Sequence, residues 1–489
     1  MNRKTILNIL GAQIVIMSIT LLIPAIIAFA YNEYDFGGFL LSAIITFFIG
    51  VPIWYLTRKN KVLSNKDGFL IVTSAWIITA IIGALPFYLS GAIPNITDAF
   101  FESMSGVTTT GATIIGNPIT LPNLPNGIES LPHGILFWRS FIQWIGGMGI
   151  IVFTIAILPL LGIGGVQMFK AEVPGPVSDK LRPRVKETAK ILWLVYVGFT
   201  ALETLLLIIG GMTGFEAICH AFTTMPTGGF STSNVSIAGW TSSAIHYIVI
   251  FFMLMAGINF SLHFKAMSGN IKSYFQDYEF KIFIGIILLV TLGIFIIVSL
   301  SEGGFTHIKF RDSLFQTVSI ITTTGYGTYN YELWSYFIQL TLVGLMFIGA
   351  MGGSTGGGIK IIRVFLIVKH SLMETRRLLH ARAIIPIRIG NRYIDESIIR
   401  NTLGFFLFYV AIFALTSASL TAMGIDITSA IGAAASAVGN IGPALGAFGP
   451  TDNYALLPDI GKWILSFAML LGRLEIFTVL ILFSRTYWR

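Results

Sequence analysis

Four strings rich in glycine and threonine have the residue types and spacing that could do chemistry. They occupy residues 105–113, 223–231, 322–327 and 438–443. Glycine adopts backbone angles closed to other residues, so successive carbonyls can be turned towards one line. A ring of such carbonyls can replace the hydration shell of a potassium ion. The residues expected to line such a path are Thr109, Thr110, Gly111, Thr227, Gly228, Gly229, Thr323, Thr324, Gly325, Asn440, Ile441 and Gly442.

The strings recur at matching places in a repeated unit. Aligned on Gly111, Gly229, Gly325 and Gly442, they are 118, 96 and 117 residues apart. Each lies between two long apolar spans and follows a stretch too short to cross a bilayer. These short stretches are residues 96–101, 214–222, 310–319 and 427–437. One such string alone would usually be a loop or a packing patch, but four at matching positions favour a shared pore axis, since extended backbone at membrane depth must line a cavity or be buried in protein.

Each short stretch is expected to be a half-helix that enters from outside and ends near the membrane centre. The C-terminal end of a helix carries partial negative charge, which favours a cation there. Four acidic residues lie on or beside these segments and predict an acidic outer mouth. They are Asp98, Glu102, Glu216 and Asp312.

The span at 336–370 is too long for a simple crossing and is interrupted by glycine. Each interior glycine costs a helix about 1 kcal/mol relative to alanine, so we expect a broken helix with an intramembrane loop. A glycine-rich helix-packing face is the alternative, but it accounts poorly for adjacent glycines. The last span contains Arg473, whose charge should face the protein and contact loop carbonyls or Glu475. The predicted gate residues are Gly352, Gly353, Ser354, Thr355, Gly356, Gly357, Gly358 and Arg473.

Composition supports a membrane protein. Of 489 residues, 54% are hydrophobic and 11% are charged, against about 25% charged in average soluble chains. We predict an all-α polytopic protein with two extra N-terminal spans and four membrane–pore–membrane repeats around one pseudo-fourfold cation pore. The predicted spans are 6–30, 39–57, 69–90, 135–161, 191–210, 244–262, 281–300, 336–370, 400–422 and 461–484. The predicted units are 1–68, 69–190, 191–280, 281–399 and 400–489.

Charge sets the expected orientation. Of the 31 lysines and arginines, 26 lie in alternate connections or at the termini, and positively charged loops stay in the cytoplasm. Both termini are therefore expected to be cytosolic, which agrees with an even number of spans. The first span is longer than the apolar core of a signal peptide, so we do not expect its cleavage. We interpret the excess of basic residues as a signal for membrane orientation, with some attraction to anionic lipid. We therefore expect no nucleic-acid partner.

Other chemistry finds little support. The chain has one cysteine, and its seven histidines are scattered without metal-ligand spacing. Residues 353–360 suggest a phosphate-binding loop, but Gly358 is followed by Ile359 and the segment lies within an apolar span. No nucleophile–base or paired-carboxylate set occurs in one context. We therefore expect neither an enzyme nor an organic cofactor.

Several of these strings resemble the Trk/Ktr/HKT superfamily of potassium transporters over essentially the whole chain. The matching segments are 108–113, 143–149, 352–360 and 439–443. Length and the two extra spans resemble the bacterial Trk branch, with TrkH/TrkG-type membrane subunits. The resemblance implies potassium uptake with K⁺ as the transported ion, a homodimer in the bacterial inner membrane, and a cytosolic nucleotide-binding regulatory partner of the TrkA type. The loop and Arg473 resemble that family's intramembrane gating loop and pore arginine.

Two points depart from simpler filters. The string at 438–443 lacks threonine, which bears on strict selectivity for potassium over sodium. At Gly111, relatives of the plant HKT type that prefer sodium carry serine.

Alternatives remain open at this point. A sodium- or proton-coupled potassium symporter would need an intramembrane ionisable relay, and the candidates within spans are Glu203, Arg473 and Glu475. A non-transporting assembly or sensor protein is the third interpretation. The basic segment 369–392 serves either topology control or docking of a regulatory partner.

Overall fold

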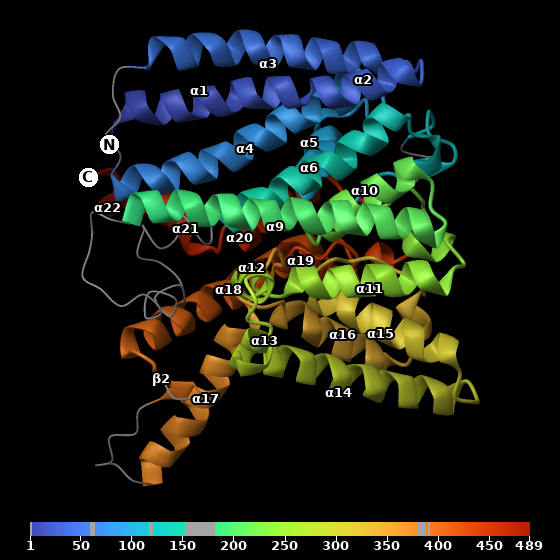
Figure 1. Ribbon diagram of the computed structural model, residues 1–489, viewed down its shortest axis with the longest axis vertical. Coiled ribbons are helices and arrows are strands. Elements are labelled where there is room, and N and C mark those ends of the chain that lie inside the picture. The colour runs from blue at the N-terminus through green and yellow to red at the C-terminus, as the bar shows by residue number, and fades with distance from the viewer. Residues whose placement is uncertain (1, 59–63, 117–120, 153–180, 380–386, 390–391) are drawn as a thin grey trace.

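A computed structural model describes residues 2–58, 64–116, 121–152, 181–379, 387–389 and 392–489. An N-terminal hairpin forms one long edge of the molecule (Figure 1). It consists of α1 (Arg3–Thr20), α2 (Leu22–Ala30) and α3 (Phe36–Leu56). Gly11 and Gly50 let α1 and α3 approach closely, since a Cβ at Gly11 would lie 2.7 Å from the Trp54 nitrogen. This hairpin stands before the repeated units, as the sequence predicts.

Four units of helix, short helix, extended string and helix follow. The first helices of the units are α4 (Asn65–Leu89), α9 (Leu181–Gly210), α14 (Tyr278–Ser301) and α18 (Glu396–Ala422). The short pore helices are α5 (Ile96–Val107), α10 (Gly214–Thr224), α15 (His307–Ile321) and α19 (Ile427–Gly439). The second helices begin with α6 (His133–Val152), α11 (Ser243–Gly257), α16 (Tyr336–Ile348) and α20 (Asp459–Arg473). The prediction of four half-helices that end at the strings is confirmed.

Side-chain caps begin the pore helices. Asn95, Thr213, Thr306 and Asp426 each accept a hydrogen bond from the first turn of the following helix. Such capping satisfies amide groups that have no partner within the helix. Most residues of α19 are buried, and it is built largely from alanine, glycine and serine, which lets the helix sit close to its neighbours.

Three second helices are broken. Between α16 and α17 (Ile361–Leu379) the chain is not helical, which confirms the predicted break in 336–370. The predictions of single continuous spans at 244–262 and 461–484 are wrong, because each of these segments is bent at a break. There, α11 meets α12 (Phe260–Met267) at 102°, and α20 meets the segment 477–483 at 109°.

These two bends have local causes. At the first, Asn259 caps α12 by accepting a hydrogen bond from the Ser261 amide, while freed backbone at Ala256 and Gly257 bonds the loop that follows α16. At the second, Glu475 and Ile476 both adopt positive φ, of 55° and 45°. A non-glycine residue in that region ends a right-handed helix.

By length and composition, six helices among the described residues could cross a membrane, or up to eight if each bent pair is one span. The six agree with the predicted spans 6–30, 39–57, 69–90, 191–210, 281–300 and 400–422. The predicted span 135–161 continues beyond Val152, outside the described residues. Most of residues 162–190, the basic connection between the predicted spans 135–161 and 191–210 that is expected to be cytosolic, also lies outside them.

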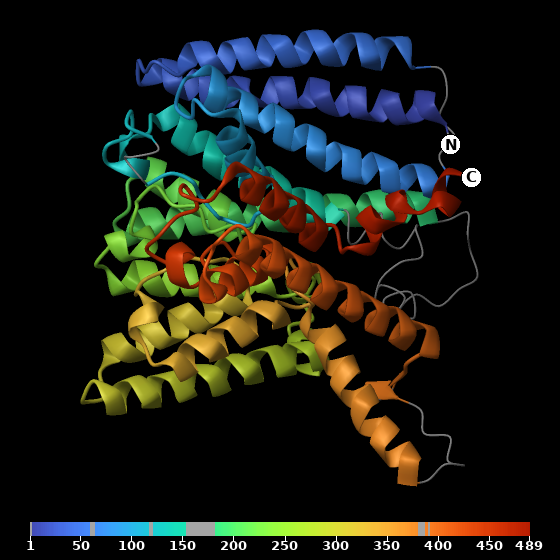
Figure 2. The ribbon, with the colours of Figure 1, turned by 180° about the vertical axis from the view of Figure 1, so that it is seen from behind.

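Both chain ends lie on one face of the molecule (Figure 1), where Asn2 and Tyr487 each hydrogen-bond the start of α4. We call this the inner face and the opposite one, where the pore helices begin, the outer face. Helix α17 projects from the body on the inner side (Figure 2). The remaining elements are α13 (Lys272–Gln276), α21 (Phe477–Leu480), α22 (Arg485–Trp488), β1 (Arg388–Ile389), β2 (Arg392–Tyr393), and the short 3-10 turns Gly127–Ser130, Ser236–Gly239, Tyr331–Leu333, Gly446–Phe448 and Ile481–Phe483.

Candidate ion pathway

The four strings form a closed ring in chain order. A Cβ built on any aligned glycine would collide with a carbonyl oxygen of the next string, and the fourth glycine faces the first string. These approaches are Gly111 to Gly228 at 2.1 Å, Gly229 to Thr324 at 2.0 Å, Gly325 to Ile441 at 1.9 Å and Gly442 to Thr110 at 2.7 Å. The structure thus brings together all twelve residues predicted to line the path, with a pseudo-fourfold arrangement.

Backbone angles repeat around the ring. Each string has positive φ at the aligned glycine and again two residues earlier. The earlier residues are Thr109 at 51°, Thr227 at 58°, Thr323 at 60° and Asn440 at 55°. Threonine is β-branched and rarely adopts such angles, and strain of this kind is held only where surrounding structure enforces it. The four strings aligned on their glycines therefore share the same pattern of positive φ angles.

Each string begins as the cap of its pore helix. The amide just before the aligned glycine donates to the carbonyl five residues earlier, which is the long bond of a Schellman cap. The four bonds are Thr110 to Ser105 at 2.8 Å, Gly228 to Thr223 at 2.8 Å, Thr324 to Ser319 at 2.9 Å and Ile441 to Ser436 at 3.0 Å. The C-terminal, partially negative end of each pore helix consequently meets the ring.

Most ring carbonyls have no partner from the protein. The carbonyl of Gly228 accepts from Gln143 Nε2 at 2.8 Å, and that of Gly442 accepts from Ser436 and Tyr454. Within the described residues, the carbonyls of the other ten predicted residues accept no hydrogen bond. Buried backbone carbonyls are nearly always paired. Ten unpaired carbonyls around one ring are a set of oxygen ligands suited to a cation.

Side chains around the ring also tie adjacent units together, and of these residues the sequence singled out only Thr110 and Asn440. The Tyr326 hydroxyl bonds Thr223 of the second unit. Between the third and fourth units, Tyr331 Oη donates to the Ala444 carbonyl at 2.6 Å. Asn440 Nδ2 closes the circle by donating to Thr110 Oγ1 at 3.0 Å. Because these pairs are more than 100 residues apart in sequence, no local pattern could reveal them.

The glycine-rich loop 349–360 packs against the inner side of the ring. The Gly357 amide donates to Thr323 Oγ1 at 2.6 Å, and Thr355 Oγ1 donates to the Met225 carbonyl at 2.9 Å. A Cβ at Gly357 would lie 2.2 Å from the Gly439 carbonyl oxygen. The predicted gate residues 352–358 therefore lie directly beneath the second, third and fourth strings.

Arg473 ends α20 beside this loop and is 2% exposed. Its Nη1 donates to the Thr355 carbonyl at 2.6 Å, as predicted for a loop carbonyl. Its Nε and Nη2 have no hydrogen-bond partner within the described part of the chain. The alternative prediction, that Arg473 contacts Glu475, is wrong, since Glu475 pairs with Arg363 Nη2 at 2.5 Å.

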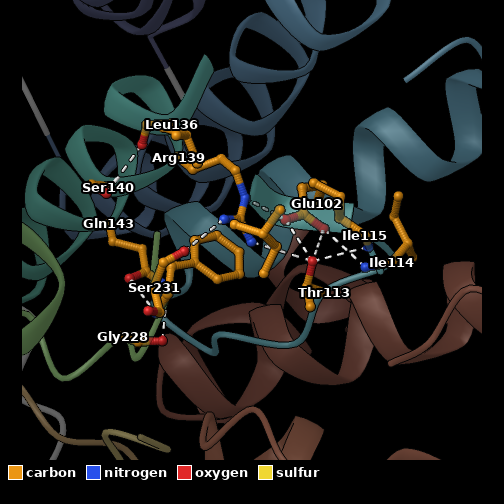
Figure 3. A network of polar contacts seen from close by, with 12 residues as sticks. Glu102, Thr113, Ile114, Ile115, Leu136, Arg139, Ser140, Gln143, Gly228 and Ser231 are labelled. Atoms are coloured by element: carbon orange, nitrogen blue, oxygen red, sulfur yellow. Dashed lines mark hydrogen bonds and ion pairs between the residues drawn. The ribbon is translucent and has the colours of Figure 1, made fainter. Parts of the chain in front are cut away.

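On the outer side, a network centred on Arg139 joins the first two strings (Figure 3). Arg139 is 1% exposed, and its Nε lies 2.9 Å from Glu102 Oε1. The guanidinium also donates to the Ser231 carbonyl at 3.2 Å, while Glu102 accepts from Thr113 Oγ1 and the Ile114 amide at 3.0 Å. The ion pair thus braces the outer ends of both strings.

The prediction that acidic residues of the pore helices charge the outer mouth is wrong for three of them. Glu102 pairs with Arg139, Asp98 pairs with Lys462 at 2.5 Å, and Asp312 pairs with Arg311 at 3.0 Å. Glu216 caps the start of α10. Buried charges need compensation, so carboxylates on tightly packed pore helices take the basic residues of that side as partners.

Two other carboxylates take their place at the outer face. A cavity of about 370 Å³ opens beside the end of the first string and is lined by Thr113, Asn126, Glu129, Asn234 and Asp452, among others. Among the described residues, no basic side chain lines it. Burial raises the pKa of the Asp452 carboxyl. These residues come from separate connections, and the sequence offered no signal for them.

Comparisons with known proteins agree with this geometry. The family model TrkH, described as a cation transport protein, matches residues 38–489. The Trk system potassium uptake protein TrkH of Escherichia coli K12 is 42% identical over all of both chains, and TrkG of that strain is 34% identical over 99% of each. The crystal structure of the potassium transporter TrkH from Vibrio parahaemolyticus aligns with a TM-score of 0.89 at 38% identity, covering both chains completely. The chain belongs to the TrkH family, whose members are transport proteins and not enzymes.

Proposed function

We propose that this chain is the pore-forming subunit of a potassium-uptake system and conducts K⁺ in a channel-like manner through the ring. The ten unpaired ring carbonyls carry this proposal, because they offer oxygen ligands from four sides without a competing protein donor. Carbonyl rings replace the hydration shell of potassium. The relatives named as potassium uptake proteins support the choice of ion.

The loop at 352–358 and Arg473 are proposed as the gate. The loop contacts three of the four strings from the inner side, and Arg473, which has no carboxylate partner within the described part of the chain, brings a positive charge to the same place. A positive charge beneath a cation path opposes permeation. Opening of the pathway then requires the loop to move away from the inner side of the ring, and the charge of Arg473 to move or be screened.

The setting of the protein is also proposed. We infer a multi-pass protein of the bacterial inner membrane with both termini cytosolic, forming a homodimer and regulated by a cytosolic nucleotide-binding subunit of the TrkA type. The excess of lysine and arginine in alternate connections of the sequence and the shared face of both termini support the orientation. The names of the relatives as Trk system proteins support a partner subunit. The unit boundaries 69–190, 191–280, 281–399 and 400–489 remain predictions.

A coupled potassium symporter is the second candidate function. The buried acidic residue Glu203 supports it. This residue of α9 is fully buried, its carboxyl group interacts with the Thr224 hydroxyl, and it forms no ion pair among the described residues. Ionisable groups inside membranes often carry protons in transporters. Arg473 and Glu475 are less suited, since each is already held by a protein group.

Rubidium uptake and reversal potentials in proteoliposomes test these proposals. With the cytosolic partner added, we expect reversal potentials to follow the potassium gradient alone. A shift with pH or sodium at fixed potassium would favour the symporter. Protein that carries no rubidium under any of these conditions would contradict both.

A further inference from the structure

Glu279 joins the two ends of the intramembrane loop from a helix outside the ring. It is the second residue of α14 and is 9% exposed. Its Oε1 accepts hydrogen bonds from the Gly352 amide at 2.8 Å and the Ile362 amide at 3.3 Å. Gly352 lies near the start of the loop and Ile362 just after its end. One carboxylate oxygen therefore holds both ends to α14.

Most other ties of the loop base are backbone bonds. The Met351 amide donates to the Gly257 carbonyl, and the Gly353 carbonyl accepts from the Phe260 amide, both at 3.1 Å. Side-chain substitution cannot remove such bonds. Contacts at the loop apex involve Thr323 of the ring and Arg473, so altering them also alters the ring or the charge beneath it. Glu279 is an anchor that can be removed without touching either.

The energetics favour a strong anchor. A carboxylate near the first turn of a helix is stabilised by the helix dipole, and Glu279 lies in that turn of α14. Hydrogen bonds to a charged acceptor are about twice as strong as neutral ones. Two amides of the loop thus share an acceptor that α14 already holds in place.

We propose that Glu279 is a positioning residue that keeps the loop seated beneath the ring, so that its loss releases the loop and raises ion flux. This inference rests on the proposed function of the loop as a gate. It assigns the loop two separate restraints: Arg473 at the apex, with a charge near the ion path, and Glu279 at the base, away from the ring.

Three variants and a matched control test it. Glu279→Ala removes the acceptor, Glu279→Met removes it while filling the space, and Glu279→Gln keeps an oxygen in position. Asp277→Asn is the control, since Asp277 lies at the same helix end and its Oδ1 accepts from the Phe280 amide of its own helix at 2.8 Å. Two readouts are measured without the cytosolic partner: rubidium flux into liposomes, and hydrogen exchange of peptides covering residues 349–362.

For Glu279→Ala and Glu279→Met we expect about tenfold faster exchange in those peptides, from the loss of a charge-assisted bond, together with a several-fold higher flux. Glu279→Gln keeps only a neutral acceptor, so its exchange and flux should fall between those of the parent protein and Glu279→Met. Asp277→Asn should stay within about twofold of the parent protein. Parent-like exchange in Glu279→Met would overturn the anchor. Faster exchange with parent-like flux, or an equal rise in Asp277→Asn, would overturn its role in gating. A parent protein that fails to conduct even with its partner would instead defeat the proposed function, while exchange would still report on the anchor.

Discussion

Arg139 and Arg473 are buried to nearly the same degree on opposite sides of the ring, with exposures of 1% and 2%, but their surroundings differ. Arg139 has a carboxylate partner in Glu102 and further acceptors from two strings. Arg473 has one loop carbonyl, and two of its donors have no partner among the described residues. A charge paired with an opposite charge stabilises the fold, whereas a positive charge without such a partner repels a cation in the nearby pathway. The outer arginine should therefore matter for stability and the inner one for permeation.

Removing Arg139 should have the largest effect. Arg139→Leu leaves Glu102 buried and unpaired, and breaking a buried pair in this way costs about 3–5 kcal/mol. We expect a marked loss of thermal stability in detergent, or failure to insert. The double variant Glu102→Leu with Arg139→Leu should recover much of that stability, because no charge is left unpaired. If Arg139→Leu alone is as stable as the parent protein, the claim that the outer arginine matters for stability is contradicted.

The ring between the two arginines should depend on its glycines. Alanine at Gly111, Gly229, Gly325 or Gly442 must adopt positive φ and place its Cβ within 2.7 Å of a neighbouring carbonyl oxygen. We expect potassium flux or selectivity over sodium to fall by about tenfold or more in each variant, since the added Cβ must displace a ring carbonyl and a loss of about 1.4 kcal/mol in ion coordination is already tenfold. Membrane insertion should persist. Unchanged flux and selectivity in all four variants would rule out the ring as the filter.

Removing Arg473 should raise flux and leave stability nearly unchanged. Arg473→Ala deletes a charge whose burial is poorly compensated, so little stability is lost, while the barrier beneath the ring falls. We expect several-fold more rubidium flux in liposomes without the cytosolic partner. Shortening residues 352–358 should act in the same direction. Folded variants that conduct no better than the parent would contradict the gate assignment.

The outer cavity should show the smallest effect. Neutralising Glu129 and Asp452 as Glu129→Gln and Asp452→Asn should reduce flux by about twofold at low ionic strength and leave it unchanged at high salt, because exposed charges are screened. Acidifying the outer solution should act similarly, since the raised pKa of Asp452 lets protons neutralise it at a less acidic pH. The exposed Glu302, which faces Lys309, provides a control substitution. Flux that ignores both carboxylates at low salt would show that the cavity does not concentrate cations.

The sequence determined the membrane class, the four units and the position of the ring residues. Local properties set these features: apolar length, the recurrence of strings around Gly111, Gly229, Gly325 and Gly442, and glycine density at 349–358. The break after Ile348 was predictable for the same reason. Each of these signals is carried by neighbouring residues, so a single chain suffices to show it.

Only the tertiary structure decided which charges are compensated and which carbonyls are free. Glu102 and Asp98 look alike in sequence as acidic residues of a mouth, yet Arg139 and Lys462 neutralise them from other helices. Glu475 lies two residues from Arg473 and still pairs with Arg363 of α17, because α20 ends at Arg473 and Glu475 itself adopts positive φ, which breaks the helical register between the two side chains. Partner choice depends on distances between segments that are remote in the chain, and burial makes that choice costly to change.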